Sequence, residues 1–148
     1  MTTPTVHASA VLVGARAVLI RGPSGSGKSR LAITLLQAAE TGTLSFARLI
    51  GDDRVHVEAA HGRLLVRPAT EVIGQIEVRG LGIRRVPYEP VGVVGLVVEL
   101  EAVSERLPAP NQQEVDVAGI RLPRLAVAAG ADPLPLLLAH FWTSPSGV

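Results

Sequence analysis

The sequence contains no cysteine and very few aromatic residues. The absence of cysteine from all 148 positions excludes disulfide bonds, zinc–thiolate sites and thiol nucleophiles. It suits a reducing compartment, and we expect a cytoplasmic protein. Aromatic residues make up 3% of the chain and hydrophobic residues 47%, which predicts an aliphatic core. A chain of this length buries about two thirds of the surface that its unfolded form exposes, enough for the core of one domain.

An excess of charge of one sign and long hydrophobic runs are also missing. The formal net charge is +1, which indicates no strong attraction to nucleic acid or to a membrane surface. The stretches richest in apolar residues, Val91–Leu100 and Leu134–Trp142, are shorter than the roughly 20 residues of a membrane-spanning helix. The first residues do not resemble a signal peptide, because no basic segment precedes an apolar one. We expect neither nucleic-acid binding nor membrane insertion.

The hydrophobic pattern predicts strands interrupted by one long helix. Apolar residues recur at helical spacing from Lys28 to about Glu40, and Thr41-Gly42 supplies a stop signal. A closing helix is predicted over Pro133–Phe141, and an exposed loop over Ser104–Gln113. Short apolar or alternating runs predict strands at Ala10–Val13, Ala17–Ile20, Leu44–Ile50, Val55–Glu58, Leu64–Arg67, Ile76–Val78, Val91–Leu100 and Arg121–Val127.

One segment matches the phosphate-binding pattern G-x-x-x-x-G-K-[ST] in full. Its residues are Gly22, Pro23, Ser24, Gly25, Ser26, Gly27, Lys28 and Ser29. An apolar strand precedes it and a helix follows, so backbone N–H groups could converge on phosphate oxygens at the helix N-terminus. Lys28 would place a charge near the β- and γ-phosphates, and the Ser29 hydroxyl would bind Mg²⁺. The alternative is a chance glycine-rich turn, but the complete motif between the expected elements favours a nucleotide site.

Several polar residues elsewhere could complete such a site. Asp52 and Asp53 end a predicted strand, where a carboxylate could hold the metal or accept a proton from a substrate hydroxyl. An ordinary turn is the alternative, because Gly-Asp-Asp is also good turn chemistry. Glu77 and Arg79 would share one face of a strand and could hold Mg²⁺ and phosphate, or could form a solvated pair. Taken alone, His7 fits a structural role better than a catalytic one.

Together these segments resemble the C-terminal catalytic domain of bacterial HPr kinase/phosphorylase. The resemblance runs from about His7 to Arg106 and includes the Gly22–Ser29 motif and the doubled aspartate. Its most specific part is Glu77–Ile83, E-V-R-G-L-G-I, which looks like the family signature E-[IV]-R-G-L-G-I. The implied fold is α/β, a P-loop-containing mixed β-sheet with flanking helices of the type shared with phosphoenolpyruvate carboxykinase. The chain would then be one P-loop kinase domain, residues 1–148.

The resemblance implies an ATP-dependent serine kinase of the phosphotransferase system, acting on the phosphocarrier protein HPr or its nitrogen-system relative. ATP would bind to Gly22–Ser29 and to Arg79. Ser29 and Glu77 would hold Mg²⁺, with Asp52 supporting the metal or the base. The implied catalytic residues are Asp53, His7, Lys28 and Arg106. Of these, Asp53 matches the aspartate that takes the proton from the HPr serine hydroxyl.

The chain also departs from the family pattern. The N-terminal domain of full-length members is absent, as in short forms like those of α-proteobacteria. The family's arginine-containing stretch for dephosphorylation should fall near Leu122–Asp132, where only Arg124 is basic. Kinase activity is therefore better supported than phosphorolysis. The alternatives are a nucleotide-sensing module with weak or lost phosphotransfer and a P-loop kinase for a small molecule. Full-length relatives are hexameric, so a homo-oligomer is compatible with the resemblance.

Overall fold

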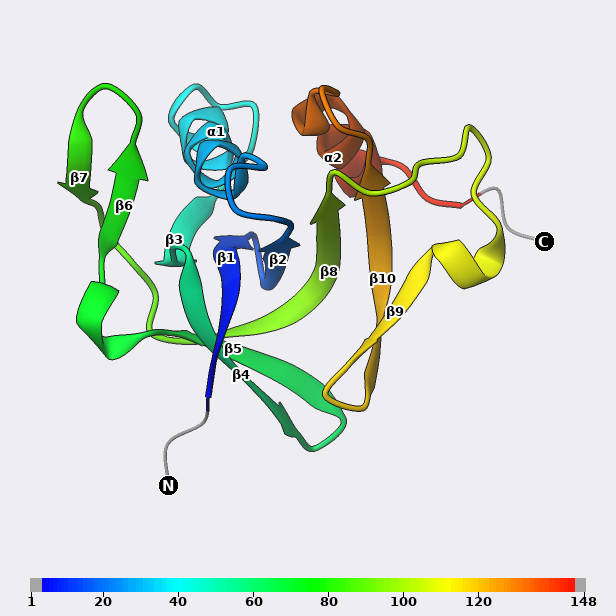
Figure 1. Ribbon diagram of the computed structural model, residues 1–148, viewed down its shortest axis with the longest axis horizontal. Coiled ribbons are helices and arrows are strands. Elements are labelled where there is room, and N and C mark those ends of the chain that lie inside the picture. Colours follow the sequence, from blue (N-terminus) through cyan, green and yellow to red (C-terminus); the bar gives the residue numbers. More distant parts are fainter. Residues whose placement is uncertain (1–3, 146–148) are drawn as a thin grey trace.

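A curved, mixed β-sheet carries two helices on one of its faces (Figure 1). The computed structural model describes residues 4–145. The helices are α1, Lys28–Glu40, and α2, Pro133–Trp142, and 3₁₀ turns cover Thr70–Val72 and Pro110–Gln112. The strands are β1 Thr5–Val13, β2 Arg16–Arg21, β3 Ala47–Gly51, β4 Arg54–Ala60, β5 Arg63–Pro68, β6 Gln75–Val78, β7 Gly82–Arg85, β8 Gly92–Leu100, β9 Glu114–Val117 and β10 Ile120–Val127. The predicted mixed α/β class is confirmed.

The main sheet closes on itself. Strand β1 pairs antiparallel with β2 and β4, β4 pairs with β5, and β5 pairs with β8. A parallel pairing between β2 and β8 completes the ring. Strand β3 adds to β1, while β10 lies parallel to β8 and carries β9 at the edge. Because β2 leads directly into the Gly22–Ser29 loop, the ring fixes the start of that loop against β8.

The sheet separates two aliphatic cores. One core lies between the sheet and both helices, and includes Val11, Leu35 and Leu137. The other lies on the opposite face, inside the ring, and includes Leu19 and Val97. Alternation along β1, β2 and β8 sends successive side chains to opposite cores. Every buried core residue within residues 4–145 is aliphatic, which confirms the prediction from composition.

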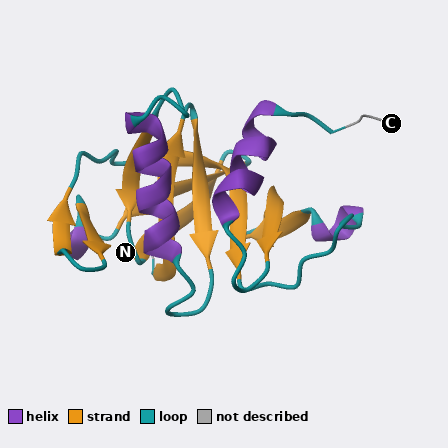
Figure 2. Ribbon diagram, turned by 90° about the horizontal axis from the view of Figure 1, so that it is seen from above, coloured by secondary structure: helices purple, strands orange, loops and turns teal. Residues whose placement is uncertain are grey.

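Helix α1 has the predicted boundaries and positions the loop that precedes it. Leu31, Ala32, Leu35 and Ala38 are its buried aliphatic residues, and they recur at the spacing of one helical face. This face packs against β1, β3 and β6. Figure 2 shows α1 and α2 crossing the same side of the sheet. The N-terminus of α1 therefore lies over the sheet, close to the bend that joins β3 and β4.

The chain between β3 and β4 bends at Asp52 and Asp53, opposite the middle of β1. The β1–β3 pair Ala10–Gly51 and the β1–β4 pair His7–Arg54 share one register, and the register shifts between Ala10 and Val11. The two aspartates occupy the intervening positions and lack regular strand geometry. The β6–β7 hairpin, which carries the Glu77–Ile83 segment, lies beside α1 (Figure 1). These elements bring Asp52 and Glu77 close to Ser29 in the first turn of α1.

Candidate active site

The Gly22–Ser29 loop has the geometry of an open cradle. A Cβ atom on Gly22 would lie 2.5 Å from Ser26 Oγ and 3.0 Å from Leu100 Cβ, so only glycine allows this packing on β8. Gly27 has a φ of +102° and is the N-cap of α1, where no side chain accepts a hydrogen bond from the first turn. The backbone N–H groups of that turn are therefore available to an anion.

Lys28 is a buried cation without an acidic partner. Its side chain is 6% exposed, and Nζ donates hydrogen bonds to the carbonyl oxygens of Gly22, at 2.9 Å, and Pro23, at 3.1 Å. Among residues 4–145, no carboxylate forms an ion pair with this ammonium group. The Ser26 hydroxyl in the same loop is buried and has no hydrogen-bond partner. Both groups fit a phosphate, which would supply the missing negative charge and acceptor atoms.

Asp52 is a buried carboxylate that faces the first turn of α1. Its Oδ1 accepts hydrogen bonds from the Ser29 hydroxyl at 2.7 Å and from the Ser9 hydroxyl at 2.8 Å. Its Oδ2 accepts one from the Glu77 backbone N–H at 3.2 Å. Within the described part of the chain, no Lys, Arg or His forms an ion pair with it. A carboxylate and a hydroxyl in contact beside a phosphate cradle are ligands that Mg²⁺ accepts.

Asp53 turns outward from the same bend. Its φ is +67°, a left-handed conformation that costs a residue with a Cβ about 1–2 kcal/mol. Its side chain is 63% exposed, and its Oδ1 lies 3.5 Å from Nδ1 of His7, itself an exposed residue. The two adjacent aspartates therefore have different surroundings: Asp52 is enclosed by donors, whereas Asp53 is accessible to a macromolecular substrate.

A small cleft joins these acidic residues. Its volume is about 120 Å³, and its polar lining includes Asp52, Asp53 and Glu77. Among residues 4–145, no three His, Asp or Glu side chains are close enough to hold a metal ion by themselves. This matches the usual binding of Mg²⁺, which takes one or two protein carboxylates together with phosphate oxygens and water. The Ser29 hydroxyl and the Asp52 carboxylate beside the loop are oxygen donors of the kind that Mg²⁺ takes together with phosphate.

The two predicted arginines lie outside this network. Strand β6 ends at Val78, so Arg79 falls in the hairpin turn rather than on the strand face that carries Glu77. Arg106 lies in the exposed loop that follows β8. Neither side chain forms a hydrogen bond or an ion pair with another residue described in the structure. Both remain predictions as phosphate-binding groups.

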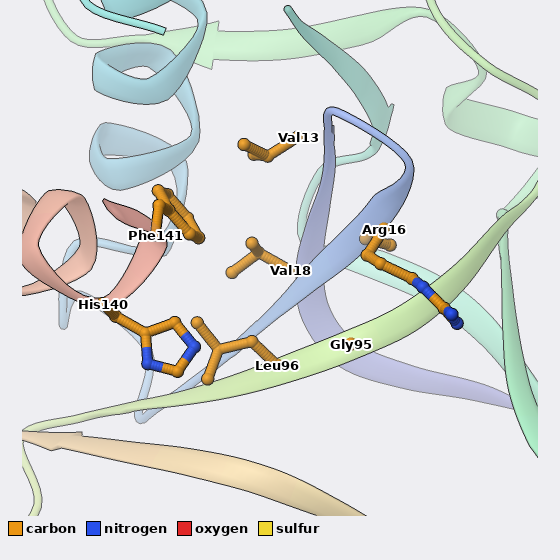
Figure 3. A pocket seen from close by; sticks show the side chains of 8 residues that line it. Val13, Arg16, Val18, Gly95, Leu96, His140 and Phe141 are labelled. Carbon is orange, nitrogen blue, oxygen red and sulfur yellow. The ribbon is translucent and has the colours of Figure 1, made fainter. Parts of the chain in front are cut away.

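A larger cavity, of about 340 Å³, lies away from the acidic residues (Figure 3). It is formed by the β1–β2 hairpin, β8 and the end of α2, and its lining is mainly aliphatic. Its polar residues are Arg16 and His140, and the guanidinium of Arg16 extends away from the other labelled side chains. The site chemistry is therefore concentrated in the smaller cleft.

Sequence reasoning missed two supports of the site. Ser9 is fully buried and contacts both aspartates, but a single serine in an apolar strand carries no motif. The guanidinium of Arg21 donates through Nε to Glu99 Oε1 at 3.1 Å, linking β2 to β8 directly before the loop. An arginine next to Gly22 and a carboxylate late in an apolar strand could have suggested this pair, but only with the parallel β2–β8 pairing known.

The sequence of the chain was matched to a known protein family. The family described as HPr Serine kinase C-terminal domain matches residues 1–128 of the chain. The chain belongs to this family. The match includes every predicted site residue from His7 to Arg106. It confirms the resemblance that the Gly22–Ser29 and Glu77–Ile83 segments had indicated.

Individual relatives are consistent with this assignment. An HPr kinase/phosphorylase of Streptococcus thermophilus is 34% identical over 136 residues, covering 83% of this chain and 41% of the relative. One of Clostridium beijerinckii is 37% identical over 78 residues, covering 53% of this chain and 24% of the relative. The chain thus spans about two fifths of the length of the Streptococcus thermophilus relative.

A solved structure shares the fold. The Hpr(Ser) kinase/phosphatase from Coxiella burnetii superposes with a TM-score of 0.70 at 24% identity, covering 93% of each chain. At this identity the similarity concerns the arrangement of the sheet and helices. Neither helix among residues 4–145 is long and apolar enough to cross a membrane.

Proposed function

We propose that this chain catalyses ATP-dependent phosphorylation of a serine hydroxyl on the phosphocarrier protein HPr or its nitrogen-system relative. The observation that carries the proposal is the contact between Ser29 of the loop and Asp52, next to the exposed Asp53. This arrangement puts a phosphate cradle, a candidate metal ligand and an accessible carboxylate side by side. Family membership and the names of the relatives support the choice of a kinase and of HPr.

The Gly22–Ser29 loop would hold the triphosphate of ATP. The buried Lys28 ammonium would turn from the loop carbonyls to the phosphates, and the N–H groups of the first turn of α1 would donate to phosphate oxygens. Ser29 and Asp52, with Glu77 at the cleft, would hold Mg²⁺. The metal would supply charge neutralisation on the phosphates. Arg79 and Arg106 are proposed as further cationic contacts from the hairpin turn and the loop after β8.

Asp53 is the proposed general base. Its exposed carboxylate can reach a hydroxyl on another protein, whereas the Asp52 carboxylate is enclosed by donors. A base at this position would take the proton from the serine hydroxyl as that oxygen forms a bond to the γ-phosphorus of ATP. The bond between this phosphorus and the β,γ-bridging oxygen would break, and ADP would leave. His7 contacts Asp53 and, when protonated, would add positive charge beside the phosphates. Catalysis would come mainly from positioning and charge neutralisation.

The fold type, the cellular compartment and the oligomeric state are part of the same proposal. We propose that the residues form a P-loop kinase domain of the type shared with phosphoenolpyruvate carboxykinase, working in the cytoplasm. The closed sheet and the helix after the loop support the P-loop part of this statement. A homo-oligomer is part of the same proposal, since the resemblance to full-length relatives suggested it.

The direct test is to incubate the protein with labelled ATP, Mg²⁺ and purified HPr, and to locate the phosphate by mass spectrometry. Wild type should yield phosphoserine. Asp53→Asn should lower kcat by about 100-fold or more, within the usual range for a lost general base, with ATP affinity changed by less than about threefold. Nucleotide binding without transfer to HPr, in wild type, would leave a nucleotide-sensing module as the better description.

A further inference from the structure

Among residues 4–145, Ser9 is the one fully buried polar residue that forms hydrogen bonds with both aspartates. It lies on β1, opposite Asp52 in the register defined by the pairs Ala10–Gly51 and His7–Arg54. Its neighbours on the strand, Ala8 and Ala10, face the core inside the ring, so its own side chain faces α1. Ser9 is 0% exposed and lies in the buried part of the strand, where its neighbours Ala8 and Ala10 are aliphatic. A lone hydroxyl at such a position needs partners, and it has two.

The Ser9 hydroxyl uses both of its hydrogen-bonding capacities at the bend. It donates to Asp52 Oδ1 at 2.8 Å and accepts from the Asp53 backbone N–H at 3.0 Å. The donated bond helps to direct the Asp52 carboxylate toward Ser29. The accepted bond holds the amide of Asp53, whose left-handed backbone needs support from its surroundings. One side chain thus fixes the orientation of the enclosed aspartate and the backbone of the exposed one.

We propose that Ser9 is a positioning residue for the phosphoryl-transfer site. It acts through Asp52 and Asp53 and touches neither nucleotide nor protein substrate. If Ser29 turns toward a nucleotide-bound Mg²⁺, Asp52 Oδ1 loses the hydrogen bond from Ser29. The hydrogen bond from the Ser9 hydroxyl then remains and holds the carboxylate in place. Asp53 meanwhile keeps the conformation that presents its carboxylate beside His7. The inference rests on the proposed function for its catalytic consequence, although its structural part can be measured on the protein alone.

The test compares Ser9→Ala and Ser9→Thr with Val11→Ala. Alanine removes both hydrogen bonds, and threonine keeps a hydroxyl. Val11 is equally buried, lies two residues further along β1 in the core next to α1, and has no side-chain hydrogen-bonding group, so its truncation controls for lost stability. All three are made in the full chain, and their melting temperatures are recorded first.

The first measurement uses the protein without nucleotide. Amide hydrogen exchange at Asp53, followed by NMR, should become at least tenfold faster in Ser9→Ala than in wild type. Ser9→Thr and Val11→Ala should stay within about threefold of wild type at this amide. Unchanged exchange at Asp53 in Ser9→Ala would overturn the inference, whatever reaction the protein catalyses.

The second measurement uses nucleotide. The thermal stabilisation by ATP in EDTA should be the same in Ser9→Ala and wild type, whereas the additional stabilisation by Mg²⁺ should be largely lost. With HPr, kcat of Ser9→Ala should fall about 10- to 100-fold, as for other lost supports of metal ligands, with KM for ATP nearly unchanged. Ser9→Thr should recover most of kcat.

The outcomes separate this inference from the proposed function. If wild type binds Mg²⁺ and ATP but transfers nothing to HPr, the proposed function fails, and a selective loss of the Mg²⁺ effect in Ser9→Ala still supports Ser9. If wild type phosphorylates HPr and Ser9→Ala matches Val11→Ala in both kcat and Mg²⁺ requirement, the proposed function stands and the inference about Ser9 is wrong.

Discussion

The Lys28 ammonium group donates hydrogen bonds to two backbone carbonyl oxygens, and a phosphate would replace them as its acceptor. Its ammonium contacts the oxygens of Gly22 and Pro23, which are neutral acceptors, and the side chain is almost fully buried. A phosphate oxygen carries negative charge, so it attracts the ammonium group more strongly than a neutral carbonyl oxygen does. The lysine would therefore lose little by leaving the carbonyls and would gain a counter-ion.

Lys28→Ala should remove most of the rise in melting temperature that ATP and Mg²⁺ produce in wild type. A ligand at one hundred times its Kd stabilises the folded state by about 2.7 kcal/mol, and weaker binding reduces this directly. Thermal scans at fixed nucleotide concentration measure the effect. Arg30→Ala is the matched control, since it removes an exposed cation two positions along the same helix. Equal rises in melting temperature for the two variants would show that Lys28 does not bind the phosphates.

Glu77 contributes to the site in two ways that mutation separates. Its backbone N–H donates to Asp52 and survives any side-chain change, whereas its carboxylate lines the cleft. Glu77→Gln should therefore raise the Mg²⁺ concentration needed for half-maximal activity by about tenfold, with little change in melting temperature. A magnesium titration at saturating ATP is the measurement. Coincident titrations for variant and wild type would show that the carboxylate does not bind the metal.

The start of α2 shows how local chemistry fixes an element. Asp132 Oδ1 accepts a hydrogen bond from the Leu134 N–H at 3.1 Å, and Pro133 occupies the first turn, where its missing N–H is harmless. Leu137 then enters the core between the sheet and the helices. The helix is thus specified by a cap, a proline and a buried leucine.

Asp132→Ala should lower the free energy of unfolding by about 1 kcal/mol, because a free helix N–H loses its acceptor. Asp132→Asn should retain most of that stability, since asparagine caps equally well. Urea denaturation of the two variants and wild type measures the difference. The ATP-induced thermal shift should be equal in all three, because α2 supplies no residue to the candidate site. A smaller shift in Asp132→Ala alone would mean that α2 supports the nucleotide site.

Elements with a strong apolar pattern were predictable, and exposed or interrupted ones were not. The bounds of α1 agree with the prediction, and β8 follows the apolar run it was predicted from. Strand β7 was missed because all of its residues are exposed, leaving no buried face to mark it. Strand β9, at the sheet edge, was also missed, because only Val115 and Val117 of its four residues turn toward the core. Strand β3 begins three residues later than predicted, at Ala47.

The candidate site was predictable as a set of residues but not as an arrangement. The Gly22–Ser29 motif predicts the strand before it and the helix after it, and the doubled aspartate indicates the end of a strand. Which aspartate is enclosed and which is exposed depends on a left-handed residue opposite β1, and sequence pattern does not report that. Ser9 was invisible because its importance comes from a partner 43 residues away.

At the scale of the whole molecule, the distribution of positive charge bears on the direction of the proposed reaction. In Leu122–Asp132 the one basic residue is Arg124, and its Nη1 donates to the Gln112 carbonyl at 3.0 Å. Inorganic phosphate, the co-substrate of a reverse reaction, carries two charges and needs cationic or backbone donors near the phosphoserine. ATP depends less on such groups, because the loop and Lys28 would hold it.

On the proposed function, phosphorolysis of phosphoserine-HPr should therefore be slow at low millimolar phosphate, at least tenfold below the forward rate. Pyrophosphate release from phosphoserine-HPr, measured across a range of phosphate concentrations, checks this. The forward reaction of the same preparation serves as the control for active enzyme. Brisk pyrophosphate release at low millimolar phosphate would show that further arginines in the Leu122–Asp132 segment are dispensable.

The closure of the sheet between β2 and β8 has a consequence for how the protein is made. Arg21 and Glu99, which are linked across these strands, are 78 residues apart in the chain. A ribosome adds about 5–20 residues per second, so β2 and the loop emerge several seconds before their neighbouring strand. During that interval the nascent chain already contains every residue of the phosphate-binding motif. The loop acquires its lateral support only when β8 arrives, so on the proposed function nucleotide binding would begin only after β8 has been made.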